Sequence, residues 1–291
     1  MNKIFKCLLA STMVFGLATT TIYANAENNE AKIGNQEYGT LEEALNAAES
    51  GNTVELLTDA TIDNAVDQFG SIYVKDGVTL DGNSKKITVT GKVSGIVLNG
   101  TSTLKNVTVE NDENGKYNVQ AYMGEAKIEN VTIVDKSEGF AGVLVNGSNT
   151  TISNVTYNGS SYAAVELGKG DVVTNNPMLT INGELETGST KAVYLSTNDN
   201  ITDKTLNDLV KVNDNVTFAI DAEGNKVVAE ASLNGVNYAS LNDALESAQA
   251  GQTVKLLTDV KVAGVEALNG GLFVNDGVTL DGNNKKNHCN R

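Results

Sequence analysis

Apolar and polar residues alternate along the middle of the chain, and the alternation returns at a constant interval. The segment LKNVTV at 104–109 recurs as IENVTI at 128–133 and as ISNVTY at 152–157, each 24 residues after the one before. Such alternation is the pattern of a β-strand that buries one face. Each repeat also holds a second apolar segment, at 96–98, 119–121, 143–145, 165–167 and 193–195. Each repeat therefore predicts two short strands.

Strands that recur at this interval between Gly-, Asn- and Asp-rich turns favour a parallel β-solenoid. Parallel strands cannot be joined by tight hairpins, whereas each turn of a coil returns a strand above its predecessor. An antiparallel sandwich would not keep a constant interval. We expect an all-β, right-handed parallel β-helix of about five or six turns over 50–200. Its register should pair Val107 with Val131 and Val131 with Val155.

Three asparagines, Asn106, Asn130 and Asn154, occupy the same place in successive repeats, just before the Val-Thr strand. Stacked asparagine side chains can hydrogen-bond to one another and to the backbone of the turns. A metal site is the alternative, but neutral amides are poor ligands for hard cations without carboxylates beside them. The pattern therefore predicts a structural ladder and no metal site.

The start of the repeated region has the pattern of a capping helix. Thr40 and Glu43 form a capping box, and Gly51 is the expected end of the helix. The apolar stripe on one face of this segment consists of Leu41, Ala44, Leu45 and Ala48. We expect a helix over 41–49 that covers the core and the open strand edges at the N-terminal end of the solenoid.

Much of the chain is a duplication, because 31–86 returns at 231–286 with a constant offset. The second copy continues as NHCNR at 287–291, where the first continues as ITV at 87–89. We expect 27–230 to form a capped module and 231–291 a truncated start of a second module that lacks the 87–89 strand. We interpret the tail as a frameshift or truncation product, so His288 and Cys289 predict no metal or catalytic pair. This segment should be less stable than the first module unless its helix docks on the solenoid end.

Residues 1–26 have the pattern of a signal peptide. Lys3 and Lys6 precede an apolar stretch over 7–17, and an A-x-A cleavage site lies at 24–26. The apolar stretch is too short to span a bilayer. We expect a secreted protein, extracellular or associated with the cell surface, with no membrane insertion.

Composition excludes several partners and argues against catalysis. The chain has 36 acidic and 21 basic residues, a net charge of −15, which disfavours nucleic acid and anionic membranes. The only arginine is Arg291 and the only histidine is His288. The acidic side chains of the repeats are scattered over turns and outward positions. We expect no catalytic residues and no cofactor.

The cap pattern, the GVTLDGN segment at 77–83 and the asparagine-bearing repeats together resemble the right-handed parallel β-helix proteins of the pectate-lyase-like superfamily. More narrowly, they resemble modular secreted or surface proteins of low-GC Gram-positive bacteria. The resemblance implies a scaffold and is nearly silent on activity. Lyases of this fold use an arginine base and calcium-binding aspartates, and 27–286 contains no arginine.

The resemblance also implies that saccharides lie on a long parallel sheet of the solenoid, against aromatic rings and side-chain amides. The outward residues that fit this role are Gln120, Tyr122, Asn146, Glu166 and Tyr194. The alternative is an ordinary exterior with a few tyrosines, and the residues alone favour it. We expect a non-catalytic, adhesin-like or carbohydrate-binding module whose partner is an extracellular polysaccharide or a host or cell-surface glycan. The alternatives are a polysaccharide lyase or hydrolase of the same superfamily, and a spacer or truncated remnant of a longer repeat protein.

Overall fold

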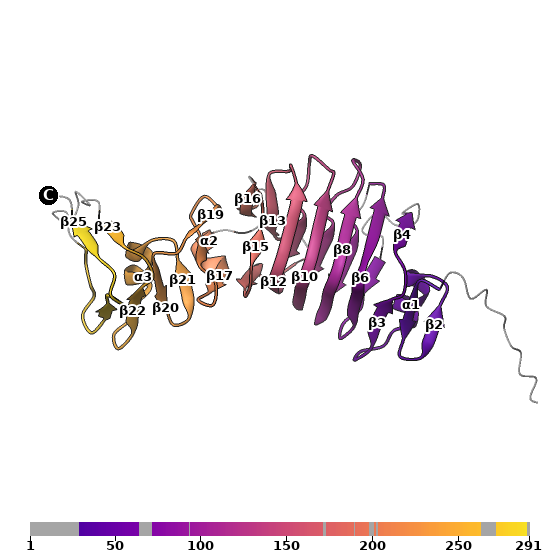
Figure 1. Ribbon diagram of the computed structural model, residues 1–291, viewed down its shortest axis with the longest axis horizontal. Helices are drawn as coiled ribbons and strands as arrows, with labels where there is room; N and C mark the ends of the chain where they lie inside the picture. The colour runs from indigo at the N-terminus through magenta and orange to yellow at the C-terminus, as the bar shows by residue number, and fades with distance from the viewer. Residues whose placement is uncertain are drawn as a thin grey trace, which may run out of the picture.

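The computed structural model describes residues 29–63, 72–92, 94–170, 173–188, 190–197, 201, 203–262 and 272–289. The expected signal peptide lies outside these residues. The described chain forms a parallel β-solenoid of about 8 turns, with the two sequence copies end to end along its long axis (Figure 1). None of the described helices is long and apolar enough to cross a membrane.

One long sheet runs the length of the solenoid. Its parallel strands are, in spatial order, β3 (Thr53–Leu56), β6 (Thr79–Thr90), β8 (Ser102–Asn111), β10 (Glu125–Asp135), β12 (Asn149–Gly159), β14 (Met178–Ile181) and β17 (Val210–Asn213). Val131 of β10 pairs with Val107 on one side and Val155 on the other, both in parallel. The predicted register is confirmed. The sheet extends past the expected limit at 200, because β17 adds a further strand to β14.

The second strand of each turn joins a separate parallel sheet, which we call the second sheet. Its strands are, in spatial order, β5 (Ile72–Val74), β7 (Ile96–Asn99), β9 (Val119–Tyr122), β11 (Val143–Asn146), β13 (Ala163–Gly168) and β16 (Lys191–Leu195). Inward residues of both sheets are almost fully buried; Ile133 and Val145, for example, are 0% exposed. The apolar side chains that alternate in the sequence therefore stack into one continuous core.

The asparagine side chains are hydrogen-bonded as a ladder along the solenoid axis. The Nδ2 atom of Asn154 donates to Oδ1 of Asn130 at 3.0 Å, and Nδ2 of Asn130 donates to Oδ1 of Asn106 at 3.1 Å. Asn106 in turn donates to Oδ1 of Asp81 at 3.1 Å, and Asn154 accepts from the Glu184 amide at 3.3 Å. All three asparagines have a positive φ, near 54° for Asn130, which asparagine tolerates better than most residues. The ladder thus stabilises the bend that precedes each strand.

The N-terminal cap consists of a hairpin and a short helix. The hairpin strands are β1 (Ala31–Ile33) and β2 (Gln36–Tyr38), and β1 also pairs with β3. Helix α1 (Leu41–Ala47) begins with the predicted capping box between Thr40 and Glu43 and contacts β1, β2, β3 and β5. The expected end at 49 is wrong. Ala48 is already extended, and Gly51 instead donates its N–H to the Gly77 carbonyl of the next turn at 2.8 Å.

The second copy repeats this architecture. Its elements are β20 (Ala231–Leu233), β21 (Val236–Tyr238), α3 (Leu241–Ser247), β22 (Thr253–Leu256), β23 (Val260–Val262), β24 (Thr279–Asp281) and β25 (Asn287–Cys289). The strand expected to be lacking is present, so that expectation is wrong. β25 pairs with β23 in parallel, as β6 pairs with β4 (Ala60–Asp63) in the first copy. Parallel pairing uses backbone groups, so it survives the loss of the Ile-Thr-Val side chains.

A hairpin strand, not the helix, connects the second copy to the first. β21 pairs antiparallel with β17, the last strand of the first solenoid. Helix α2 (Leu206–Leu209) and the hairpin of β18 (Phe218–Ile220) and β19 (Lys226–Val228) lie at this junction. The buried apolar residues of the two copies form separate clusters, one over 31–220 and one over 231–260. The long sheet is therefore continuous across two distinct cores.

Candidate binding face on the second sheet

The outer face of the second sheet brings the predicted binding residues into two adjacent rows. Gln120, Leu144, Glu166 and Tyr194 are paired in register across β9, β11, β13 and β16. Tyr122 pairs with Asn146 in the neighbouring row. Their strand neighbours, such as Val143 and Val145, point into the core and are fully buried. The period-2 pattern therefore correctly assigned these residues to one outward face.

Glu166 is the most unusual residue of this face, because its carboxylate is outward yet only 7% exposed. Two phenols cover it: Tyr117 Oη donates to Glu166 Oε2 at 2.9 Å, and Tyr162 Oη donates to the same oxygen. Burial raises the pKa of both tyrosines well above the ordinary value, and the adjacent Glu166 charge adds to the shift. Both phenols are therefore hydrogen-bond donors at neutral pH.

Aromatic rings extend the cluster on both sides of Glu166. The rings of Tyr162 and Tyr194 meet edge to face with centroids 5.2 Å apart, and Tyr117 meets Phe140 in the same way. Tyr162 remains 39% exposed. Edge-to-face packing is the preferred arrangement of aromatic pairs and holds each ring in place. The face thus carries fixed tyrosines next to a buried carboxylate.

Two shallow hollows lie along this face. Hollow A, of about 150 Å³, is lined by Tyr117, Leu144, Asn146, Glu166, Lys169 and the two glycines beside Lys169. Hollow B, of about 460 Å³, is lined on its polar side by Lys191, Tyr194, Lys204, Thr205, Asn207 and Glu223. Because Tyr194 packs on Tyr162 and Tyr162 contacts Glu166, the aromatic pair lies between the two hollows.

Three residues of the cluster were missed from the sequence. Tyr117, Phe140 and Tyr162 precede strands β9, β11 and β13 and come from the turns, not from the outward rows. The only signal is an aromatic residue shortly before the strand in successive repeats. Conversely, Gln120 and Tyr122 share the face but line neither hollow. The two hollows therefore lie on the part of this face that is nearer the C-terminal end of the solenoid.

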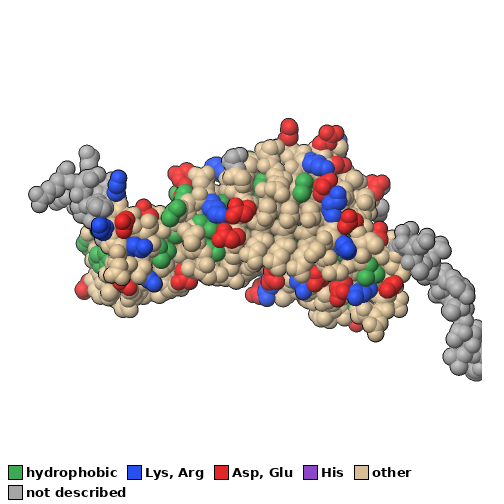
Figure 2. All heavy atoms as spheres, in the orientation of Figure 1, with side chains coloured by type: hydrophobic (Ala, Val, Ile, Leu, Met, Phe, Trp, Pro, Cys, Tyr) green, Lys and Arg blue, Asp and Glu red, His purple; other side chains and the backbone are tan. Residues whose placement is uncertain are grey.

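The outer face of the long sheet differs in character. Figure 2 shows charged side chains over β6 and β8 and along the lower margin, with a largely uncharged area over β10 and β12. Several of these charges are paired: Lys105 with Asp81 at 3.1 Å and Lys86 with Glu110 at 3.6 Å. Among the described residues, no group of three or more His, Cys, Asp or Glu side chains is placed to hold a metal ion.

A second buried carboxylate, Asp135, lies in the long sheet and is 5% exposed. Its Oδ1 accepts from Asn111 at 2.9 Å and from the Ser137 hydroxyl at 2.7 Å, and its Oδ2 accepts from the Tyr157 phenol at 2.8 Å. Such a fully hydrogen-bonded group is a structural feature of the turn. It adds nothing to the binding face.

No protein-family model, curated protein or solved structure matches this chain. The function must therefore be inferred from the chemistry of the face itself.

Proposed function

We propose that the chain is a non-catalytic secreted or cell-surface module, adhesin-like, that binds carbohydrate on the outer face of its second sheet. The observation that carries the proposal is the partly exposed Tyr162 ring, held edge-on by Tyr194 beside the buried Glu166 carboxylate. Aromatic faces pack against the C–H groups of a sugar ring, and a polar tip at the same place binds a hydroxyl. The relationship to pectate-lyase-like surface proteins of low-GC Gram-positive bacteria is part of this proposal.

The arrangement of the hollows favours an extended saccharide over a single sugar. Hollows A and B are lined from successive turns of the solenoid, so a chain lying along the axis would contact both. In hollow A the Asn146 Oδ1 atom accepts from the Gly170 amide at 3.0 Å, which fixes the side chain on the face. Fixed amides and phenols bind sugar hydroxyls at a low cost in side-chain entropy.

The absence of a catalytic step is proposed on chemical grounds. Glycoside hydrolysis in most families uses two carboxyl groups on either side of the scissile bond. Glu166 is the one carboxylate that lines hollow A, and both phenols donate to the same oxygen of it. A single carboxylate in the hollow cannot supply both the acid and the base of that mechanism.

The test is a glycan array with the chain, followed by titration of any bound glycan against Tyr162→Ala and Tyr194→Ala. Each variant should weaken binding by roughly 5- to 30-fold, because removing a stacked ring costs about 1–2 kcal/mol. Thr132→Ala, on the long sheet, should bind like the unchanged chain. Equal affinities for all three variants would show that Tyr162 and Tyr194 do not form the binding site. Release of shorter saccharides from a bound polymer would contradict the proposal that the chain is non-catalytic.

A further inference from the structure

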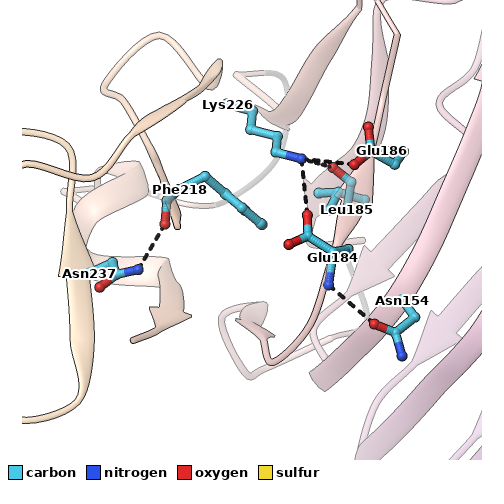
Figure 3. Close-up of polar contacts among 7 residues, drawn as sticks. All are labelled: Asn154, Glu184, Leu185, Glu186, Phe218, Lys226 and Asn237. Carbon is cyan, nitrogen blue, oxygen red and sulfur yellow. Dashed lines mark hydrogen bonds and ion pairs between the residues drawn. The ribbon is translucent and has the colours of Figure 1, made fainter. Parts of the chain in front are cut away.

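The junction between the two copies shows how one module recognises the next. Besides the β17–β21 pairing, the side chain of Asn237 in β21 is 5% exposed and donates to carbonyls of the first module. Its Nδ2 atom lies 2.9 Å from the Val216 oxygen and 3.0 Å from the Phe218 oxygen. Both acceptors belong to the segment that closes the end of the first solenoid, and Figure 3 shows the bond to Phe218.

The β18–β19 hairpin, which supplies the Phe218 carbonyl to Asn237, is held in place by Lys226. Lys226 of β19 lies over the Phe218 ring at 4.5 Å from its centroid and donates to the Leu185 carbonyl at 2.9 Å. The same ammonium is paired with Glu184 at 3.4 Å and Glu186 at 3.3 Å (Figure 3). The hairpin of β18 and β19 is thereby held against the last turns of the solenoid, so the carbonyls that Asn237 contacts are in fixed positions.

The first module carries the same hairpin with different outward residues. Position 37 is Glu where position 237 is Asn, and position 32 is Lys where position 232 is Ser. Lys32 pairs with Glu55 at 2.9 Å, and exposed Glu37 accepts from Asn29 at 2.7 Å. Ser232 is 6% exposed, buried in the same row as Asn237. The hairpin that docks is thus neutral in this row, and the hairpin at the other end is charged.

Chemistry explains why the two residues are not interchangeable. A glutamate has no hydrogen to donate, so at position 237 its carboxylate would face two carbonyl oxygens without water. Charged residues on an edge strand are a common means of preventing unwanted pairing. Among the described residues, β2 pairs with β1 alone.

We propose that the residue at position 37 or 237 determines whether a module can be joined to a preceding solenoid. The end of the first solenoid, formed by β17 and the β18–β19 hairpin, is a receptor for the N-terminal hairpin of another module with a neutral outward row. Asn237 is the specificity-determining residue of that contact. Glu37 makes the first module's hairpin an end that does not dock.

The first test is Asn237→Glu in the full chain, measured by hydrogen–deuterium exchange. The Asp214 amide donates to the Gly235 carbonyl across the junction at 3.0 Å. Amides over 210–216 should therefore exchange about tenfold faster or more in the variant. The matched control is Gln249→Glu, which also places the first copy's residue in the second copy, at an exposed position of the chain. Exchange over 210–216 that is unchanged in Asn237→Glu would overturn the proposal.

The second test changes both hairpins in one chain and does not depend on the second module remaining folded. In K32S/E37N/N237E the second module's hairpin no longer docks on the receptor, and the first module's hairpin becomes neutral. This chain should associate head to tail, with a mass that rises with concentration in sedimentation or light scattering. K32S/E37N, whose receptor stays occupied, and N237E, whose two hairpins are both charged, should remain monomeric. A monomeric triple variant, or association of N237E alone, would show that position 37 or 237 does not determine docking.

Discussion

At the scale of single residues, the solenoid depends on inward side chains that contact the turns above and below. Val131 is 1% exposed and is flanked in register by Val107 and Val155. Val131→Asp would bury a charge without a partner and should lower the free energy of unfolding by several kcal/mol. Lys127→Asp, at an exposed position of the same strand, should be nearly neutral. Thermal unfolding compares the two, and equal melting temperatures would contradict the inward assignment.

The tyrosine that binds Asp135 predicts a loss of stability at alkaline pH. Burial, together with the hydrogen bond to Asp135 and its charge, raises the pKa of Tyr157 above the ordinary 10.0. The folded state therefore keeps the proton at a pH where the unfolded state releases it. That contribution to stability is complete below the unfolded pKa and declines as pH rises from there toward the folded pKa.

Tyr157→Phe should consequently show a lower stability at pH 8 but a shallower decline between about pH 9 and 11 than the unchanged chain. Tyr122→Phe, on the outer face, is the control and should follow the unchanged chain in both respects. Urea midpoints at each pH measure the effect. Identical pH slopes for Tyr157→Phe and the unchanged chain would disprove the contribution of this phenol.

At the scale of elements, the asparagine ladder combines two effects in one side chain. Asn130 supplies hydrogen bonds to both neighbours and also occupies a backbone conformation, φ 54°, that a Cβ disfavours. Asn130→Ala removes the hydrogen bonds and places a residue that disfavours positive φ at this bend, so it should lower the free energy of unfolding by about 1–3 kcal/mol. Asn130→Gly removes the hydrogen bonds but tolerates the positive φ, so its loss should be smaller. Asn158→Ala, at an exposed position of β12, is the control. Denaturant midpoints that are equal for all three would show that the ladder contributes no stability.

Helices and strands could be predicted where the side chains themselves favour the local backbone conformation. Apolar residues that alternate within each repeat indicated the strands, the constant spacing of equivalent residues such as Val107 and Val131 indicated the register, and Thr40 with Glu43 marked the start of α1. Strand β25 was not predicted, because 287–289 lack the alternating apolar residues that mark 87–89 in the first copy. The contacts of Tyr117 and Tyr162 with Glu166 were also missed, because alternation shows which residues of a strand face outward but not which turn residues fold over them.

At the scale of the whole molecule, the two copies share a sheet but not a core. The second copy buries a much smaller apolar cluster than the first, and its β24 pairs only with β22 among the described residues. In a solenoid, stability is approximately the sum of turn stabilities and the interfaces between neighbouring turns. The first copy has many stacked turns, whereas the second depends strongly on its interface with β17.

Unfolding should therefore proceed from the second copy to the first. In hydrogen–deuterium exchange at increasing urea, amides of β22 should lose protection before those of β10, because β22 lies in the smaller core and β10 has a full turn on each side. Limited proteolysis should cut first C-terminal to β17 and leave a resistant fragment that contains the first solenoid. Simultaneous loss of protection in β22 and β10 would mean that the continuous sheet makes the two copies one cooperative unit. Asn237→Glu distinguishes stepwise unfolding from a single cooperative unit. If the copies unfold stepwise, the variant should lower the urea midpoint of β22 and leave that of β10 unchanged, since β10 lies several turns from the junction.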